Sequence, residues 1–140
     1  RLPTEGEWQY AASYKDGLSW TPYNYASGAT AAFTDTTATG LVAWYIGNSG
    51  STTKTVGTKF ANALGVHDMS GNVWEWCWDC YYPLPTTAQT DYRGPASGSS
   101  RILRGGSYGN SADVLQVGYR SANSPYDVNF GIGFRLAQKL

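Results

Sequence analysis

A segment from Asp68 to Glu75 holds the densest group of side chains that could bind a metal or a proton. Glu75 lies on an apolar stretch, where an unpaired carboxylate would cost several kcal/mol. One interpretation is a turn followed by an ion pair with an arginine, and the candidates are Arg104, Arg120 and Arg135. The other is a Ca²⁺ site, because oxygen ligands around a tight turn at Gly71 suit that ion. The spacing alone leaves both interpretations open.

Cys77 and Cys80 form a C-x-x-C pair, a spacing found in redox and zinc sites. The sequence has no second cysteine pair, and His67 is its single histidine. Positions i and i+3 of a strand point to opposite faces, so the two thiols would not converge on one ion. We therefore expect structural thiols, and we expect His67 to be a turn or core residue.

The segment from Tyr108 to Gly131 combines tyrosines with Gly, Ser, Asn and Asp. That composition is typical of binding loops, because tyrosine offers a large rigid contact area and the small residues offer adaptable hydrogen bonds. The alternative is a solvated loop with incidental tyrosines. Composition alone does not decide between them.

The elements that would position these groups can be read from local patterns. Thr4 and Glu7 have the form of a capping box, and Trp8, Ala11 and Ala12 continue at helical spacing, so a helix is predicted to end near Gly17. Strict alternation predicts a strand over 73–80, with its tryptophans on one face as core or platform residues and Glu75 on the other. Shorter strands are predicted at 41–45, 102–104 and 132–136. The predicted class is α+β, with short strands, few helices and much irregular loop.

Composition limits the function classes. The chain has 140 residues, enough for one domain, and its ten Lys+Arg balance ten Asp+Glu. Nucleic-acid binding is not expected, because it needs a basic surface. No apolar run approaches the roughly 18 residues that span a bilayer. The chain begins without methionine, so we expect it to be a piece of a longer protein. Its residues alone do not indicate a cellular compartment.

Several motifs together resemble the formylglycine-generating-enzyme (sulfatase-modifying factor) family. The most specific are GNVWEW from Gly71 and RGGS from Arg104. The matching segments are 1–12, 56–59, 62–77, 101–107 and 133–135. The resemblance implies a variant of the C-type lectin fold, with residues 1–140 as the C-terminal part of a single domain.

The resemblance also implies a structural Ca²⁺ ion, which favours the metal interpretation of the first segment. Its ligands would be Asp68, the backbone carbonyls of Gly71 and Val73, and Glu75. The enzymes of the family use two cysteines whose positions here are Asn110 and Leu115, neither of which can form a thiolate. An oxidase of the formylglycine-generating type is therefore the disfavoured alternative, and no enzyme activity is expected.

Residues 101–136 further resemble the variable region of proteins that retroelements diversify, in which this fold displays variable residues. Mutagenesis of adenines in Asn codons does not yield Trp, Lys, Glu, Gln or Met. From 108 to 131 the chain has none of these except Gln116, which is therefore excluded from the variable set. The resemblance implies a cell-surface display domain that binds a protein or other macromolecule, with any membrane contact made through a tether outside this chain. The predicted ligand-binding residues are Tyr108, Gly109, Ser111, Asp113, Gly118, Tyr119, Ser121, Tyr126, Asp127, Asn129, Phe130 and Gly131. A third possibility is an assembly module whose tyrosines face a partner subunit.

Overall fold

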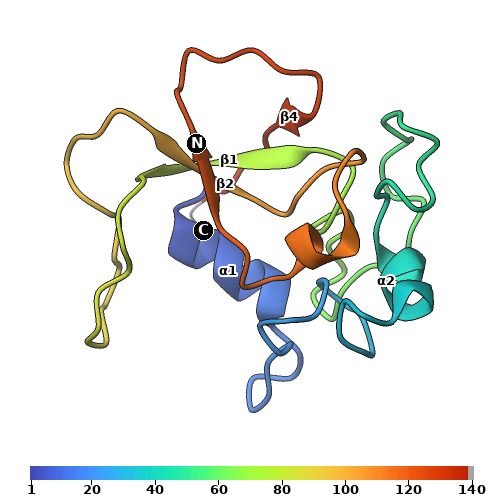
Figure 1. Cartoon of the computed structure of the whole chain (residues 1–140). Coiled ribbons are helices and arrows are strands. Elements are labelled where there is room, and N and C mark those ends of the chain that lie inside the picture. The colour runs from blue at the N-terminus through green and yellow to red at the C-terminus, as the bar shows by residue number, and fades with distance from the viewer. Residues whose placement is uncertain (139–140) are drawn as a thin grey trace.

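The computed structural model describes residues 1–138, and it is built from short elements joined by long irregular segments (Figure 1). In chain order they are α1 (Glu5–Ser13), α2 (Thr36–Val42), β1 (Trp74–Cys80), β2 (Arg101–Arg104), the 3-10 helix η1 (Ala112–Leu115), β3 (Ser121–Asn123) and β4 (Ile132–Gly133). The predicted α+β class is confirmed. None of the helices within residues 1–138 has the length and apolar character needed to cross a membrane.

One four-stranded sheet, in the order β3-β2-β1-β4, forms the centre of the fold. β1 pairs antiparallel with β2 and parallel with β4, and β2 pairs antiparallel with β3. The register of β1 against β2 shifts between Trp76 and Cys80. Helix α1 lies on one side of the sheet, and segment 124–131 arches over the opposite side (Figure 1). The sheet therefore separates a covered face from the face under the arch.

Helix α1 begins with the predicted capping box. The Thr4 hydroxyl accepts from the Glu7 amide at 3.2 Å, and the Glu7 carboxylate accepts from the Thr4 amide at 2.8 Å. These two bonds satisfy amides that have no partner within the helix. The helix ends at Ser13, earlier than the predicted Gly17, because Tyr14 turns into an extended conformation and pairs with Trp20.

The alternation of β1 is confirmed, with an unusual distribution of side chains. Glu75, Cys77 and Asp79 point to the covered face and are buried, whereas Trp78 is exposed and Trp74 and Trp76 are half-buried. The tryptophans are thus platform residues, and the acidic and thiol side chains are inside. A buried face of this kind requires partners for its carboxylates.

Three sequence-based element predictions were wrong in detail. Residues 41–42 end α2 instead of starting a strand, and Trp44 makes only a single bridge to Gly71. The strand predicted at 132–136 stops at Gly133, after which the chain leaves the sheet toward Arg1, whose carbonyl accepts from the Ala137 amide. Inside the predicted loop 108–131 the chain forms η1 and β3, and β3 has its partner only because β2 offers an open edge.

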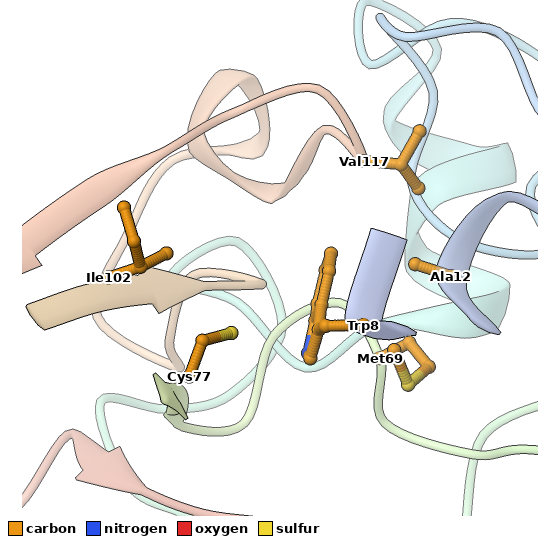
Figure 2. Close-up of a cluster of buried hydrophobic side chains, with 6 residues drawn as sticks. All are labelled: Trp8, Ala12, Met69, Cys77, Ile102 and Val117. Carbon is orange, nitrogen blue, oxygen red and sulfur yellow. The ribbon is translucent and has the colours of Figure 1, made fainter. Parts of the chain in front are cut away.

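The hydrophobic core sits between α1 and the sheet (Figure 2). Its buried members are Trp8, Ala12, Met69, Cys77, Ile102 and Val117. Gly105 and Gly106 lead the chain out of β2 with φ of 90° and 73°. A Cβ at Gly105 would lie 2.9 Å from the Met69 carbonyl oxygen, and one at Gly106 would lie 2.6 Å from Leu115. Only glycine fits this turn, which directs the following residues away from the core.

Candidate binding surface

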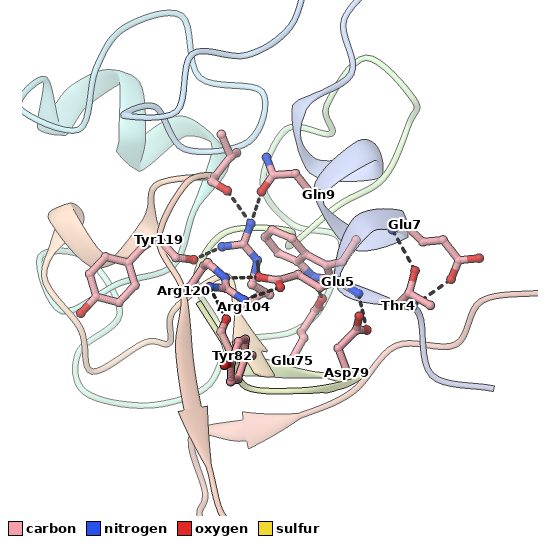
Figure 3. Close-up of polar contacts among 12 residues, drawn as sticks. Thr4, Glu5, Glu7, Gln9, Glu75, Asp79, Tyr82, Arg104, Tyr119 and Arg120 are labelled. Carbon is pink, nitrogen blue, oxygen red and sulfur yellow. Dashed lines mark hydrogen bonds and ion pairs between the residues drawn. The ribbon is translucent and has the colours of Figure 1, made fainter. Parts of the chain in front are cut away.

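Arg104, the last residue of β2, is the buried centre of a polar network (Figure 3). It is 1% exposed, and its Nη2 donates to the Val117 carbonyl at 2.8 Å. It also donates to the Tyr119 carbonyl and to the side chain of Gln9. Burial lowers the pKa of Arg104 to about 10, so it is charged at neutral pH. Arg104 therefore fixes the backbone of 117–119 from beneath.

Arg120 and Glu5 form the second part of this network. The Arg120 Nε and Nη2 donate to the two oxygens of Glu5 at 2.6 and 2.7 Å, and Nη1 donates to the Tyr82 carbonyl at 3.1 Å. The hydrogen bonds to Glu5 raise the pKa of Arg120. Glu5 also lies 3.5 Å from Arg104 Nε. One carboxylate at the start of α1 thus serves two guanidinium groups.

Glu75 forms an ion pair, one of the two interpretations left open by the sequence, and its partner is Arg135. Arg135 Nε and Nη2 donate to the two Glu75 oxygens at 2.6 and 2.5 Å, and Trp8 Nε1 donates to one of them at 2.7 Å. Arg135 Nη2 also donates to the carbonyls of His67 and Asp68. A bidentate pair of this kind is strong and geometrically specific.

The two carboxylates among the predicted calcium ligands, Asp68 and Glu75, differ in their contacts. Asp68 Oδ1 is buried without a hydrogen-bond partner, which suits a cation, while Oδ2 accepts from the Gly57 amide at 2.7 Å. Glu75 does not suit one, because Arg135 and Trp8 already use its oxygens. Within residues 1–138 no three His, Cys, Asp or Glu side chains gather closely enough to hold a metal. The set of Asp68, Gly71, Val73 and Glu75 does not fit Ca²⁺ in this arrangement, so calcium binding stays a prediction of the resemblance alone.

Most of the twelve predicted ligand-binding residues are accessible. Tyr126 and Phe130 are 91% and 94% exposed, and Tyr119 is 40% exposed. Tyr108 and Ser121 are half-buried. The other exposed members are Gly109, Ser111, Asp113, Gly118, Asp127 and Asn129. The predicted residues therefore lie at the surface, with one exception described below.

The beginning of β1 brings three parts of this set together. The Trp74 ring packs against Tyr119 with 6.1 Å between ring centroids. The Trp74 amide donates to the Gly131 carbonyl, and the Tyr108 amide donates to the Asn72 carbonyl, both at 2.8 Å. Segments near 108, 119 and 131 therefore meet around one end of the strand. We call the exposed residues of segments 108–113, 119–121 and 126–130, together with Trp74, the recognition surface.

Two of the predicted ligand-binding residues, Gly131 and Gly118, do not lie on the recognition surface. Gly131 is buried, because its carbonyl accepts from the Trp74 amide of β1 and its own amide donates to the Asn129 Oδ1 at 2.7 Å. Gly118 lies against Tyr23, to whose carbonyl its amide donates at 2.9 Å, and not with the residues around Trp74. Its place is set by the turn that follows Val117, which the sequence does not show.

Sequence reasoning also missed two residues. Val128 is 99% exposed within the arch, and its position between Tyr126 and Phe130 could have indicated it. Trp74 was predicted as a core or platform residue and not as part of a binding surface, although alternation already placed it on the face away from Glu75. Both add apolar area to the recognition surface.

Asn110 and Leu115 stand at the positions that the resemblance assigns to catalytic cysteines, and both have structural roles here. Leu115 is fully buried in a second core cluster with Ala43 and Tyr45. The Asn110 Oδ1 accepts from the amide and the hydroxyl of Ser107, both at 2.9 Å, and closes the turn after the RGGS motif. Cys77 is buried and Cys80 half-buried, and both are free thiols. Burial raises the pKa of Cys77, which leaves it an unreactive core residue.

Comparison with known proteins places these features in a family. The family model of the sulfatase-modifying factor enzyme 1-like domain matches residues 1–140. The serine/threonine-protein kinase pkn1 of Chlamydia pneumoniae is 34% identical over 100% of this chain and 21% of its own length. The formylglycine-generating enzyme of Streptomyces coelicolor is 32% identical over 98% of this chain and 46% of its own length.

Among solved structures, Treponema denticola variable protein 1 superposes with a TM-score of 0.80 at 42% identity, over 96% of this chain and 45% of that protein. This match confirms the expected fold and the resemblance to variable proteins. The chain spans less than half the length of each of these relatives. The chain belongs to the sulfatase-modifying factor enzyme 1-like family.

Proposed function

We propose that this chain is a non-enzymatic ligand-binding display domain, and that the recognition surface contacts the ligand. The observation that carries the proposal is the exposure of Tyr126, Val128 and Phe130 on an irregular segment above a rigidly bonded sheet. Large apolar side chains normally find cover in a monomer, and a cluster of exposed ones marks an interaction site. Aromatic residues are also those that dominate binding energy at interfaces.

The variable protein of Treponema denticola supports the choice of display over catalysis. A second argument is that Asn110 and Leu115 carry no thiol. The proposed ligand is a protein or another macromolecule, because the surface is an open arch and not an enclosed site. With a formal net charge of zero, nucleic acid is not the proposed partner. Display would be at the cell surface, through a tether outside these residues.

The proposal is tested with purified candidate ligands from protein and glycan arrays. Each hit is measured again with a Tyr126→Ala/Phe130→Ala variant and with Thr37→Ala, an exposed residue of α2, as the matched control. We expect the double variant to lose about tenfold or more in affinity, since each truncation removes an apolar anchor, while the control binds as the wild type does. Equal binding by both variants would overturn the recognition surface.

Two other functions give different results in the same set of proteins. If the tyrosines face a partner subunit, the double variant changes the oligomeric state in sedimentation and leaves ligand capture unchanged. An oxidase of the formylglycine-generating type would require tight stoichiometric Cu(I) on the reduced protein. We expect none, because Cys77 is buried and Cys80 lies on the opposite face of β1.

A further inference from the structure

A cleft of about 720 Å³ lies between the first turns of α1 and the loop 84–93, away from the arch of the recognition surface. Its apolar walls are formed by Tyr10, Tyr23, Leu84 and Tyr92. Arg104 and Arg120 line it at the base. The volume and the mixture of apolar walls with a few convergent polar groups are those of small-molecule sites.

The base of the cleft has a surplus of positive charge. Arg104 and Arg120 share the single carboxylate of Glu5. The other acidic side chain on the α1 wall, Glu7, does not offset this surplus, because it is paired with Arg1 at 2.6 and 2.7 Å. That pairing lowers the pKa of Glu7 to about 2.

At the rim, exposed Asp91 and Arg93 carry opposite charges that offset each other. Among the side chains that line the base, Arg104, Arg120 and Glu5 sum to one positive unit. The buried Asp79, whose Oδ2 accepts from the Glu5 amide, does not line the cleft and offsets part of that charge. A ligand carboxylate would meet the arginines directly.

Both arginines also have N–H groups that make no hydrogen bond. A guanidinium has five N–H groups, and Arg120 uses its Nε, Nη1 and Nη2 for one hydrogen bond each. Arg104 Nε is buried and makes no hydrogen bond, although it lies at ion-pair distance from Glu5. An unsatisfied buried donor on a charged group is costly. Because Arg104 Nε is buried, the donors that a ligand can reach are the N–H groups of Arg120 that make no hydrogen bond.

We propose that this cleft binds an apolar molecule with a single carboxylate group. The carboxylate accepts hydrogen bonds at the arginine base, with Arg120 as the accessible partner, and the apolar part packs between the tyrosines and Leu84. Two sources offer this chemistry, a free organic acid and the C-terminal carboxylate of a peptide that ends in an apolar residue. The apolar walls use residues outside segment 101–136, whereas Arg104, Gly118 and Arg120 line the cleft from within it. Tyr126 and Phe130, the proposed anchors of the recognition surface, do not line the cleft.

The test uses 3-phenylpropionate and its neutral amide as probes, with binding followed by chemical-shift changes in NMR. We expect the acid to bind at least about tenfold more tightly than the amide, because a hydrogen bond to a charged group is lost with the amide. A tetrapeptide ending in phenylalanine, with a free or an amidated C-terminus, separates the two sources. Tighter binding of the free peptide than of the small acid assigns the site to peptide ends, and the reverse assigns it to organic acids.

The blocking variant is Gly6→Leu. A Cβ at Gly6 meets no atom within 4 Å, and the residue lines the cleft from a helix position where leucine is well tolerated. We expect this variant to keep its melting temperature and lose acid binding, while Thr37→Leu, on the exposed surface of α2, binds as the wild type does. Equal affinity for acid and amide, no binding of either probe, or unchanged binding by Gly6→Leu would each overturn the proposal.

Discussion

The two sides of the sheet differ in what their side chains do. On the side of α1, the charged residues Glu5, Glu75 and Arg104 are buried, and each has a charged partner. On the other side, the apolar residues Tyr126 and Phe130 extend into solvent without cover. The usual arrangement, with apolar residues inside and charges outside, is thus partly reversed. The buried charged residues and the exposed apolar residues are thus different sets, so we expect that the exposed side chains can change while the fold remains.

Among the variants that test this difference between the two sides, Arg104→Met is expected to have the largest effect on the free energy of unfolding. The change leaves the buried carbonyls of Val117 and Tyr119 without their donor. Removing one partner from a buried ionic network costs about 3–5 kcal/mol. We expect a loss of about 3 kcal/mol in the free energy of unfolding, measured by urea denaturation.

The matched control is Arg93→Met, which makes the same change at an exposed arginine. Its effect should stay within about 0.5 kcal/mol. If both variants unfold at the same urea concentration, the network around Arg104 does not support the fold as described.

Glu75→Gln tests the second ion pair. The amide keeps an acceptor for Trp8 but loses the charge that holds Arg135. Hydrogen bonds to charged groups contribute about 1.5–3 kcal/mol, and because Arg135 is partly exposed we expect a loss of about 2 kcal/mol. Calorimetry of Glu75→Gln, of Arg135→Met and of the double variant Glu75→Gln/Arg135→Met measures the coupling. Additive losses in the double variant would show that the two residues do not act as a pair.

Local patterns predicted the parts of this network that lie within one element. The capping box of Thr4 and Glu7, and the place of Glu75 on the face of β1 opposite the tryptophans, follow from spacing alone. Spacing did not show which of the two faces is buried, and it did not predict which charged side chain pairs with which. In the sheet register Arg104 is directly opposite Glu75, yet its guanidinium reaches Glu5 while Glu75 binds Arg135. That choice depends on where α1 packs, which no spacing records.

Two other features show the same limit. The short helix α2 has Thr and Gly in its sequence and weak propensity, although Asp35 as N-cap, accepting from the Ala38 amide at 2.9 Å, could have indicated it. The cleft is lined by segments around 5, 23, 90 and 120, which only the tertiary fold brings together. The exposure of Tyr126 and Phe130, by contrast, was predictable, because both interpretations of the segment's composition place it at the surface. Composition did not decide whether the segment binds a ligand.

Asp79→Asn sharpens the comparison by removing a charge from the buried side. Asp79 is 2% exposed, and its Oδ1 has no hydrogen-bond partner while Oδ2 accepts from the Glu5 amide at 2.7 Å. Burial raises the pKa of Asp79, so its charged form destabilises the fold above that pKa. The neutral amide keeps one acceptor, and we expect a gain of about 1 kcal/mol at neutral pH.

The pH dependence gives the sign of this effect. Because the folded pKa is raised, wild-type stability relative to the variant is lost as the pH rises through that pKa, and recovered below the ordinary value of about 3.9. The gain should therefore be present at pH 7 and disappear toward pH 3 in thermal melts. A gain that is constant with pH would exclude titration of Asp79 as its cause.

On the exposed side, Tyr126→Ala/Phe130→Ala should leave stability nearly unchanged. Both side chains are almost fully exposed, so their removal uncovers little additional apolar surface. We expect a change within about 0.5 kcal/mol by urea denaturation, with Trp8→Ala as a contrast that loses several kcal/mol from the core. A large loss in the double variant would mean that the arch supports the fold.

The smallest effect is expected from calcium. The resemblance predicts that chelation lowers the melting temperature, whereas the contacts of Glu75 predict no change, because the guanidinium of Arg135 already supplies a cation to that carboxylate and to the carbonyls of His67 and Asp68. We expect melting curves with a chelator and with added Ca²⁺ to coincide. A rise with Ca²⁺ that Asp68→Ala abolishes would show that the ion displaces Arg135, and the charged side of the sheet would then depend on a metal in addition to its own arginines.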